Sequence, residues 1–385
     1  MKQYTSFKEG YYTRVDFANV RDLCARLSLS GVEVFMDDIV PRDNPLYADD
    51  SEKEALVELM KKANVRRIHC SYWGYPTSFL TRNRFGELVE RLGGEQAVLN
   101  YFGDLTGEKI FKRWFQEYTM VKELHATSYV FHLIDYAPID GMWPYTISKR
   151  EIRQAMIAML QHFINLLIQD GIITNDSPII EVENAGFGLE YGMQDAEDFM
   201  LLFRQLYDPF DKVRIGWDIN HLLHAIGFDE QQNKARFFLM DAEITPSMKE
   251  LQEKSNGSPA EFAHAWIEHN VLQSDLIDKV GGIHLSDCAL KRTEHFTNGR
   301  LNGPEYAEIC SLKSWEEREE YGVNIVLSEY DSHLPIGQGI LIPERVRGLI
   351  DSLSKLNGNV SLLHELKNSH DLENDLREQI ALLQL

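Results

Sequence analysis

Imidazoles and carboxylates recur at the ends of short apolar runs in this sequence. Six such runs close on a residue of this kind: His69, His132, Glu183, Asp218, His284 and Glu365. Three more lie nearby, His221 in the stretch DINH and Asp331 with His333 in the stretch DSH. Mixed nitrogen and oxygen ligands with few thiolates suit Zn²⁺, Mn²⁺ or a related divalent cation. If the fold gathers these side chains, they predict a centre of about one to three metal ions per chain.

The stretch IIEVENAG places two glutamates, Glu181 and Glu183, at the end of an otherwise apolar run. Because side chains alternate across a strand, both glutamates face the same way. Glu183 at the strand end would then be a ligand. Glu181 would lie deeper, where it either supports the ligands or forms a buried salt bridge. A single histidine at a strand end is more often structural, so the metal prediction depends on the whole set.

The elements that must position these residues alternate between strand and helix along the chain. Short apolar runs predict strands that end at His69 and His132, and others over 32–36, 179–183, 213–218, 281–284 and 360–365. Apolar residues at helical spacing predict helices over 16–29, 151–168 and 343–356, and another from about Asp371 onward. Strands alternating in this way with helices predict a parallel sheet.

About eight strand–helix units close into a (β/α)₈ barrel. We therefore predict an α/β protein with a single TIM-barrel domain over residues 1–385. A doubly wound open sheet is the competing architecture, although no GxGxxG or GxxxxGK[ST] stretch follows any strand. A minimal barrel needs about 250 residues, so the surplus predicts long insertions near 74–128, 225–277 and 288–328. The carboxyl ends of barrel strands meet at one rim, where the predicted ligands would converge.

Composition limits the partners of the protein. Acidic residues outnumber basic ones by 60 to 39, and the net charge of −21 repels polyanions and anionic membranes at long range. The sequence has no apolar stretch of membrane-spanning length and no signal-peptide pattern at its start, so we expect a cytoplasmic protein. The four cysteines, which we expect to be reduced, lie far apart without a CxxC pair: Cys24, Cys70, Cys288 and Cys310.

Two further patterns bear on the substrate. The stretch 37–54 contains seven acidic residues against Arg42 and Lys53, whereas DNA binding normally uses a clustered basic surface. The same stretch could simply be a solvated charged loop. Aromatic residues follow three of the predicted ligands and could wall a pocket for a small polyol, or could equally pack in the barrel: Tyr72, Trp73, Tyr75, Tyr136, Trp143, Tyr145, Phe187 and Tyr191.

Seven segments in order resemble the endonuclease IV and xylose isomerase-like TIM-barrel superfamily: HCSY, FHL, VENAGFG, DINHLLHAIGFD, HLSD, DSHLPIGQG and LLHEL. ENAG, DxxH and DxH are the most specific of these. In the endonuclease IV branch, the resemblance implies a three-zinc cluster held by His69, His132, Glu183, Asp218, His221, His284, Asp331, His333 and Glu365. In the sugar isomerase and epimerase branch, it implies one divalent ion held by Glu183, Asp218, His284 and Glu365.

The end of the sequence leaves two alternatives for the last barrel strand. The run NIVLSEYDSH could end in Glu329 as the ligand, but the family pattern of a glycine-rich segment, a helix and a final glutamate strand favours Glu365. The long insertion between His284 and Asp331 departs from the family pattern and could displace the DxH pair.

On this balance the sequence favours a metal-dependent isomerase or epimerase acting on a small sugar or sugar derivative. Glu183 and Glu365 would act as general base and acid, and His221 would orient the substrate. The alternative is an endonuclease IV-like zinc phosphodiesterase of the AP endonuclease type with a di- or trinuclear centre. A third reading is a binding protein that keeps a structural metal. We expect neither a nucleic acid nor a membrane as partner, and the resemblance allows a homo-oligomer.

Overall fold

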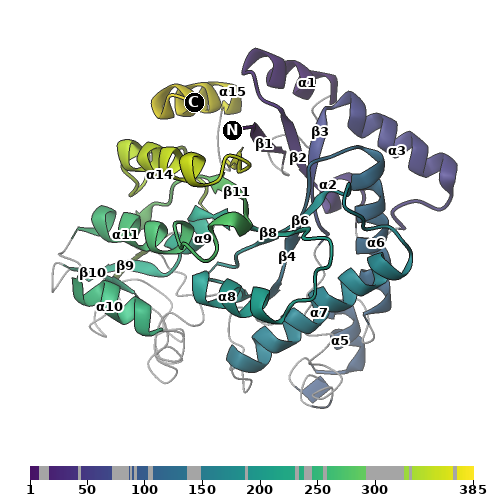
Figure 1. Ribbon diagram of the computed structural model, residues 1–385, viewed down its shortest axis with the longest axis horizontal. Helices are drawn as coiled ribbons and strands as arrows, with labels where there is room; N and C mark the ends of the chain where they lie inside the picture. Colours follow the sequence, from purple (N-terminus) through teal and green to yellow (C-terminus); the bar gives the residue numbers. More distant parts are fainter. Residues whose placement is uncertain are drawn as a thin grey trace.

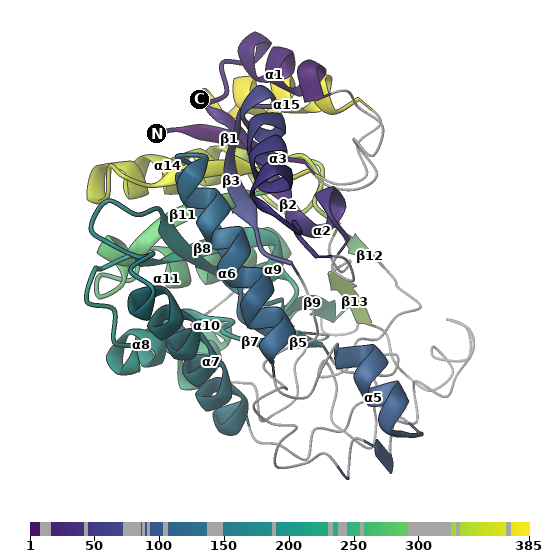
Figure 2. The same ribbon diagram turned by 90° about the vertical axis from the view of Figure 1, so that its right-hand side faces the viewer.

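Eight parallel strands form a closed barrel in the computed structural model of the protein (Figures 1 and 2). The structure describes residues 1–7, 17–41, 45–71, 86, 89–90, 93–102, 107–136, 149–186, 190–229, 234–237, 245–254, 258–291, 325–328, 332–366 and 371–385. Going round the barrel, the strands follow the order β1, β14, β11, β8, β6, β4, β3 and β2. The predicted α/β TIM barrel is confirmed, and the open sheet is excluded because the first strand pairs with the last.

Seven of the eight barrel strands coincide closely with the predicted apolar runs, and the first strand, β1, was not predicted. The bounds of all eight are β1 Gln3–Phe7, β2 Gly31–Phe35, β3 Val65–His69, β4 Ser128–His132, β6 Ile179–Glu183, β8 Val213–Asp218, β11 Val280–Leu285 and β14 Ser361–His364. Nearly every described residue of these strands is buried. Helices cover the outside and a packed interior fills the inside, so strands buried on both faces read as continuous apolar runs.

Most of the helices form the outer layer of the barrel (Figure 1), whereas α5 lies away from the barrel strands (Figure 2). Their bounds are α1 Phe17–Arg26, α2 Met36–Ile39, α3 Asp50–Lys62, α5 Glu95–Phe102, α6 Glu108–Glu123, α7 Lys149–Gln169, α8 Ala196–Gln205, α9 Ile219–Leu223, α10 Pro246–Lys254, α11 Pro259–Val271, the 3₁₀ helix η1 Ile277–Lys279, α14 Pro343–Leu356 and α15 Leu372–Leu383.

Helix α14 begins and ends where the sequence predicted. Pro343 occupies its first turn, where a missing N–H costs nothing. The predicted apolar face is buried except at Leu356, which is 58% exposed. The apolar spacing of the sequence predicts a buried face of Val346, Leu349, Ile350, Leu353 and Leu356. Leu356 departs from this prediction because it is the last residue of the helix.

Two small sheets are added to the barrel beyond the carboxyl ends of its strands. One pairs β5 Ile134–Tyr136 with β7 Glu190–Gly192. The other has the order β10, β9, β13, β12, with bounds Lys234–Phe237, Ile226–Asp229, Ile325–Ser328 and Leu290–Lys291. Figure 2 shows β5, β7, β9, β12 and β13 gathered on one side of the barrel. Because each of these strands follows the end of a barrel strand or pairs with one that does, the added sheets flank the mouth.

The position of β13 decides between the two candidates for the last barrel strand. β13 pairs antiparallel with β9 and lies outside the barrel, whereas β14 closes the barrel against β1 and β11. Glu365 therefore follows the eighth barrel strand, as the sequence favoured. Glu329 lies outside the described residues.

Other sequence predictions have partial answers. Cys24, Cys70 and Cys288 are buried and free of disulfides, and Cys310 lies outside the described residues. Within the part of the chain that the structure describes, no helix is both long enough and apolar enough to cross a membrane. The extent of a single domain over 1–385, the bounds of its insertions, the cytoplasmic location and the oligomeric state stay predictions.

Candidate metal centre

The barrel brings eight of the nine predicted ligands together at its mouth. Their candidate ligand atoms fall into three groups, within each of which they lie at most 4.8 Å apart. The groups are His69, His132 and Glu183; Asp218, His221 and His333; and Glu183, Asp218, His284 and Glu365. All eight side chains are buried. The ninth, Asp331, lies outside the described residues.

The first group joins the ends of β3, β4 and β6. His132 Nε2 lies 2.6 Å from Glu183 Oε2, and His69 Nε2 lies 3.3 Å from the same oxygen. His69 Nδ1–H donates to the carbonyl oxygen of Cys70 at 3.0 Å. A carbonyl can only accept, so this bond leaves Nε2 as the nitrogen that faces Glu183.

The second group forms where β8 runs into α9. His221 Nε2 lies 3.4 Å and His333 Nε2 3.9 Å from Asp218 Oδ2. His221 Nδ1–H donates to the carbonyl oxygen of Asn184 at 2.8 Å, and His333 Nδ1 lies 3.2 Å from the carbonyl oxygen of Glu365. In both rings, therefore, the second nitrogen is fixed by the backbone and Nε2 points into the centre.

The third group uses β11 and the residue after β14. His284 Nδ1 lies 2.8 Å from Glu365 Oε2 and 3.3 Å from Glu183 Oε1. His284 thus faces the centre with Nδ1, unlike the three rings whose Nδ1 lies against a backbone carbonyl. Its Nε2 points down into the barrel, toward Glu181 Oε1 at 3.8 Å.

The donor set fits divalent cations. Glu183 Oε2 and Asp218 Oδ2 are buried, and neither oxygen forms a hydrogen bond of ordinary geometry with a described residue. Every ion-pair partner of these two carboxylates within the described part of the chain is a histidine. Buried carboxylates that face one another need a compensating positive charge, and imidazole with carboxylate is a donor set that Zn²⁺ and Mn²⁺ accept.

The pKa shifts within the centre also indicate that positive charge is favoured next to its carboxylates. Burial raises the pKa of Glu183, but the imidazoles of His132 and His284 outweigh it and hold this pKa well below the ordinary value. Burial lowers the pKa of His284, but the carboxylates of Glu183, Glu181 and Glu365 hold it well above the ordinary value. The carboxylates of the centre therefore favour positive charge beside them, which is what a divalent cation would supply.

The asparagine of the ENAG stretch has a positioning role that the sequence did not indicate. Asn184 Oδ1 accepts from the backbone N–H of Asp218 at 2.6 Å, and its Nδ2 donates to the carbonyl oxygen of Asp218 at 3.2 Å. Its own carbonyl fixes His221. The residue that follows β6 thus holds both ends of the DxxH motif at the end of β8.

The HLSD and GQG stretches support the second group. Ser286 Oγ lies 2.9 Å from His333 Nδ1. Asp287 Oδ2 accepts from the backbone N–H of Gly337 and of Gly339, each at 2.9 Å. A Cβ on Gly339 would lie 2.4 Å from the carbonyl oxygen of Cys288, so only glycine allows this approach. Asp287 therefore holds in place the segment that follows His333.

Of the two alternatives that the sequence left open for Glu181, the structure shows the buried salt bridge. Its carboxylate pairs with Arg67 inside the barrel, at 2.7 Å from Nη2 and 3.0 Å from Nη1. It also lies below His284. Burial raises the pKa of Glu181, but Arg67 and His284 outweigh it and hold this pKa below the ordinary value.

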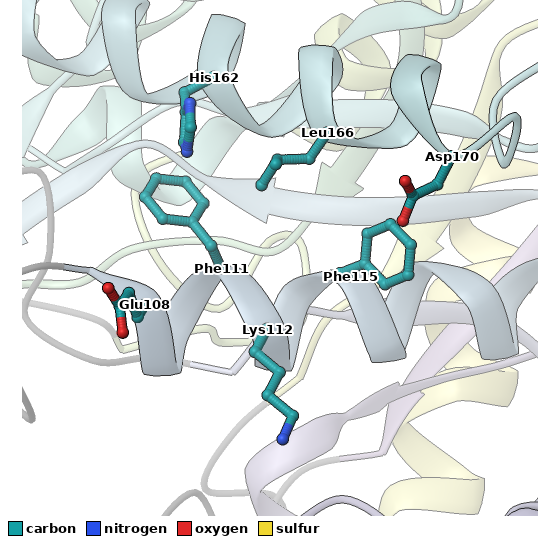
Figure 3. A pocket seen from close by; sticks show the side chains of 7 residues that line it. All are labelled: Glu108, Phe111, Lys112, Phe115, His162, Leu166 and Asp170. Atoms are coloured by element: carbon teal, nitrogen blue, oxygen red, sulfur yellow. The ribbon is translucent and has the colours of Figure 1, made fainter.

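The predicted aromatic wall cannot be placed. Its eight side chains lie outside the described residues, although the backbones of Tyr136 and Tyr191 are described as parts of β5 and β7. A pocket of about 590 Å³ does exist elsewhere, between α6 and α7 on the outer layer. Figure 3 shows His162 above the ring of Phe111 in this pocket. None of its lining residues belongs to the candidate metal centre.

Comparisons with known proteins bear on the fold. No protein-family model matches the sequence, and no curated protein matches it either. Among solved structures, the chain is similar to a 3-keto-D-glucoside 4-epimerase from E. coli, with a TM-score of 0.52, 11% identity, and coverage of 100% of this chain and 99% of that chain. It is also similar to endonuclease IV from Thermus thermophilus, with a TM-score of 0.50, 16% identity, and coverage of 100% and 99%.

A D-allulose 3-epimerase from Methylomonas sp. in complex with D-allulose gives a TM-score of 0.50 at 10% identity, with coverage of 100% of this chain and 96% of that chain. The predicted resemblance to the xylose isomerase-like and endonuclease IV-like barrels is thereby confirmed at the level of the fold. Because one fold supports many reactions, the chemistry has to be argued from the site itself.

Proposed function

We propose that the protein hydrolyses a phosphoester of a small molecule at a centre that holds more than one divalent cation. The observation that supports this proposal is the sharing of ligands, because Glu183 and Asp218 each belong to two of the three groups. A single ion would need only one of these groups. Shared carboxylates suit neighbouring ions that act together on one substrate.

The roles of the chain's own residues follow from the three groups. Glu183 and Asp218 would each face two cations, and the Nε2 atoms of His69, His132 and His221 would complete their shells. When bound, the cations would lower the pKa of a water molecule and stabilise the charge that develops on the phosphoryl oxygens. Asn184 would hold Asp218 and His221 in their relative positions through the hydrogen bonds described above.

We propose a small substrate rather than DNA because of the charge of the stretch 37–54, which follows β2. Helix capping explains part of the acidity of the stretch 37–54: Asp49 Oδ1 accepts from Glu52 N at 3.0 Å, and Glu52 Oε2 accepts from Ala48 N at 2.7 Å. Lys53, the one basic residue of this stretch that the structure describes, lies 3.0 Å from Glu123. The described part of the stretch therefore offers no basic surface to a phosphate backbone.

A metal-dependent isomerase or epimerase of a small sugar is the second candidate, and one observation favours it. Glu183, Asp218, His284 and Glu365 form a four-ligand group that is complete by itself. In this reaction Glu183 and Glu365 would remove and return a proton on opposite faces of a carbon next to a carbonyl, and His221 would orient a substrate oxygen.

Metal counting and turnover test the two candidates together. Protein purified without chelator would be analysed for its metal content. It would then be assayed with p-nitrophenyl phosphate, bis-p-nitrophenyl phosphate, an abasic-site oligonucleotide and a panel of ketoses and aldoses. Two or three ions per chain with hydrolysis of a small phosphoester is the expected result. One ion with sugar turnover would favour the second candidate, and bound metal without turnover would favour a binding protein.

A further inference from the structure

A network of buried charges lies directly beneath the candidate metal centre. Arg67 Nε donates to Glu33 Oε2 at 2.9 Å, and the two Nη atoms of Arg67 donate to the two carboxylate oxygens of Glu181. Arg67 Nη1 also donates to Ser361 Oγ at 2.9 Å. The three charged side chains are at most 1% exposed. The network therefore joins β2, β3, β6 and β14 inside the barrel.

Two glycines on neighbouring strands make room for the Glu181 carboxylate. A Cβ on Gly216 in β8 would lie 2.9 Å from Glu181 Oε1, and a Cβ on Gly282 in β11 would lie 2.4 Å from it. Glycine inside a strand costs stability, because it packs no side chain and loses more backbone freedom on folding. Two strand positions next to this one carboxylate therefore lack a side chain. The space for Glu181 is provided by Gly216 and Gly282, in addition to its pairing with Arg67.

The carboxylate of Glu181 lies against the ring of His284. This ring faces the centre with Nδ1, whereas His69, His132, His221 and His333 face it with Nε2. His284 directs Nδ1 toward Glu183 and Glu365. Its Nε2 lies 3.5 Å from Arg67 Nη2, at the outer limit of a hydrogen bond, and 3.8 Å from Glu181 Oε1, which is an ion-pair distance. If Nδ1 is the ligand atom, Nε2 must carry the hydrogen. Arg67 can only donate, so Glu181 is the acceptor that this hydrogen can use.

We propose that Glu181 is a positioning residue: when His284 Nδ1 binds the cation shared with Glu183 and Glu365, Glu181 would accept the Nε2–H across the contact that measures 3.8 Å here, while Arg67 holds Glu181 in place. This inference rests on the proposed metal centre. A ligating histidine commonly donates its second N–H to a carboxylate or a carbonyl, which fixes the ring and raises its basicity. In His69 and His221 a backbone carbonyl has this part. For His284, the side chain of Glu181 would be this acceptor.

The test compares Glu181→Gln with Glu33→Gln, using Co²⁺ as the probe. Both variants remove one negative charge next to Arg67, but only Glu181 lies against His284. Co²⁺ affinity would be measured by competition with a chelator, and the geometry of the site by the visible absorption of the Co²⁺ protein. We expect Glu181→Gln to weaken Co²⁺ binding by about 10- to 100-fold and to change the spectrum. Glu33→Gln should keep the spectrum and most of the affinity.

Equal losses of affinity in the two variants would assign the effect to charge and overturn the inference, as would an unchanged affinity in Glu181→Gln. If Glu181→Gln does not fold, Gly216→Ala decides, because its methyl group would displace the carboxylate without changing any charge. Wild-type affinity in Gly216→Ala would overturn the inference. Wild-type protein that binds no Co²⁺ would overturn the proposed metal centre itself, whereas tight wild-type binding with an unaffected Glu181→Gln would overturn only the positioning role.

Discussion

Two buried glutamates, Glu117 on α6 and Glu183 at the end of β6, have opposite surroundings. Glu117 accepts from Ser71 N at 3.1 Å, Arg113 Nε at 2.8 Å and Tyr129 OH at 2.7 Å. Glu183 instead shares its surroundings with other carboxylates and has only histidines as ion-pair partners among the described residues. A carboxylate with a structural role is enclosed by donors, whereas one that faces other acids is suited to a cation from outside the chain.

The largest effect is expected from a substitution at the mouth of the barrel, where activity should be lost. Glu183→Gln removes the carboxylate that two ligand groups share, so we expect activity to fall at least about 1,000-fold, which corresponds to about 4 kcal/mol. Metal content per chain should fall as well. Far-UV circular dichroism should still show a folded barrel, because the substitution keeps the size of the side chain. A fully active variant would remove Glu183 from the mechanism and erase the contrast with Glu117.

The reverse pattern is expected at Glu117. Glu117→Gln leaves the buried guanidinium of Arg113 without its charge partner, and breaking a buried pair in this way costs about 3 to 5 kcal/mol of unfolding free energy. Urea denaturation would measure this loss. Metal content per folded chain should stay at the wild-type level. A variant of normal stability that has lost its metal would place Glu117 in the centre and contradict the comparison.

A smaller effect should distinguish an outer-layer histidine from those of the mouth. His264 Nε2 accepts from the backbone N–H of Ile342 at 2.8 Å, which requires a neutral ring. Burial, and then the charge of Arg345, lowers the pKa of His264 to about 4. The unfolded chain, with a pKa of about 6.5, binds this proton first as pH falls. Stability from His264 is therefore fully present above about pH 6.5 and is lost as pH falls toward about 4.

We expect this loss to reach about 2 kcal/mol of unfolding free energy between about pH 7.5 and about pH 5. Urea denaturation of wild type and His264→Gln at both pH values would measure it. The wild type should lose more stability than the variant, because glutamine can still accept the Ile342 hydrogen bond but does not titrate. Equal pH dependence in the two proteins would show that His264 does not contribute.

The sequence predicted well which side chains gather at the mouth, because a strand end can be recognised locally. An apolar run that stops at a histidine or a carboxylate indicates both the strand and the side of the barrel, so His132, Glu183 and Asp218 could be named without coordinates. Arg67 could also have been found. It precedes His69 by two residues and must therefore face the same way, just as Glu181 faces the same way as Glu183.

Other parts of the site depend on contacts that no local pattern shows. Asn184 acts on His221 through its backbone carbonyl, and any residue has such a carbonyl. Ser286 meets His333 only because β11 and the segment after β13 lie side by side. The pairing of β9 with β13 joins two insertions that are far apart in the sequence, so it could not be predicted from either one.

The seam between β1 and β14 joins the first barrel strand to the last, and Glu365 follows directly after β14. During synthesis the barrel sheet therefore keeps an open edge at β1 until β14 has left the ribosome. Closure of that edge and arrival of the final carboxylate are one event, so a nascent chain that lacks β14 has neither a sealed sheet nor a complete third ligand group. Assembly of the centre thus reports that the barrel has closed.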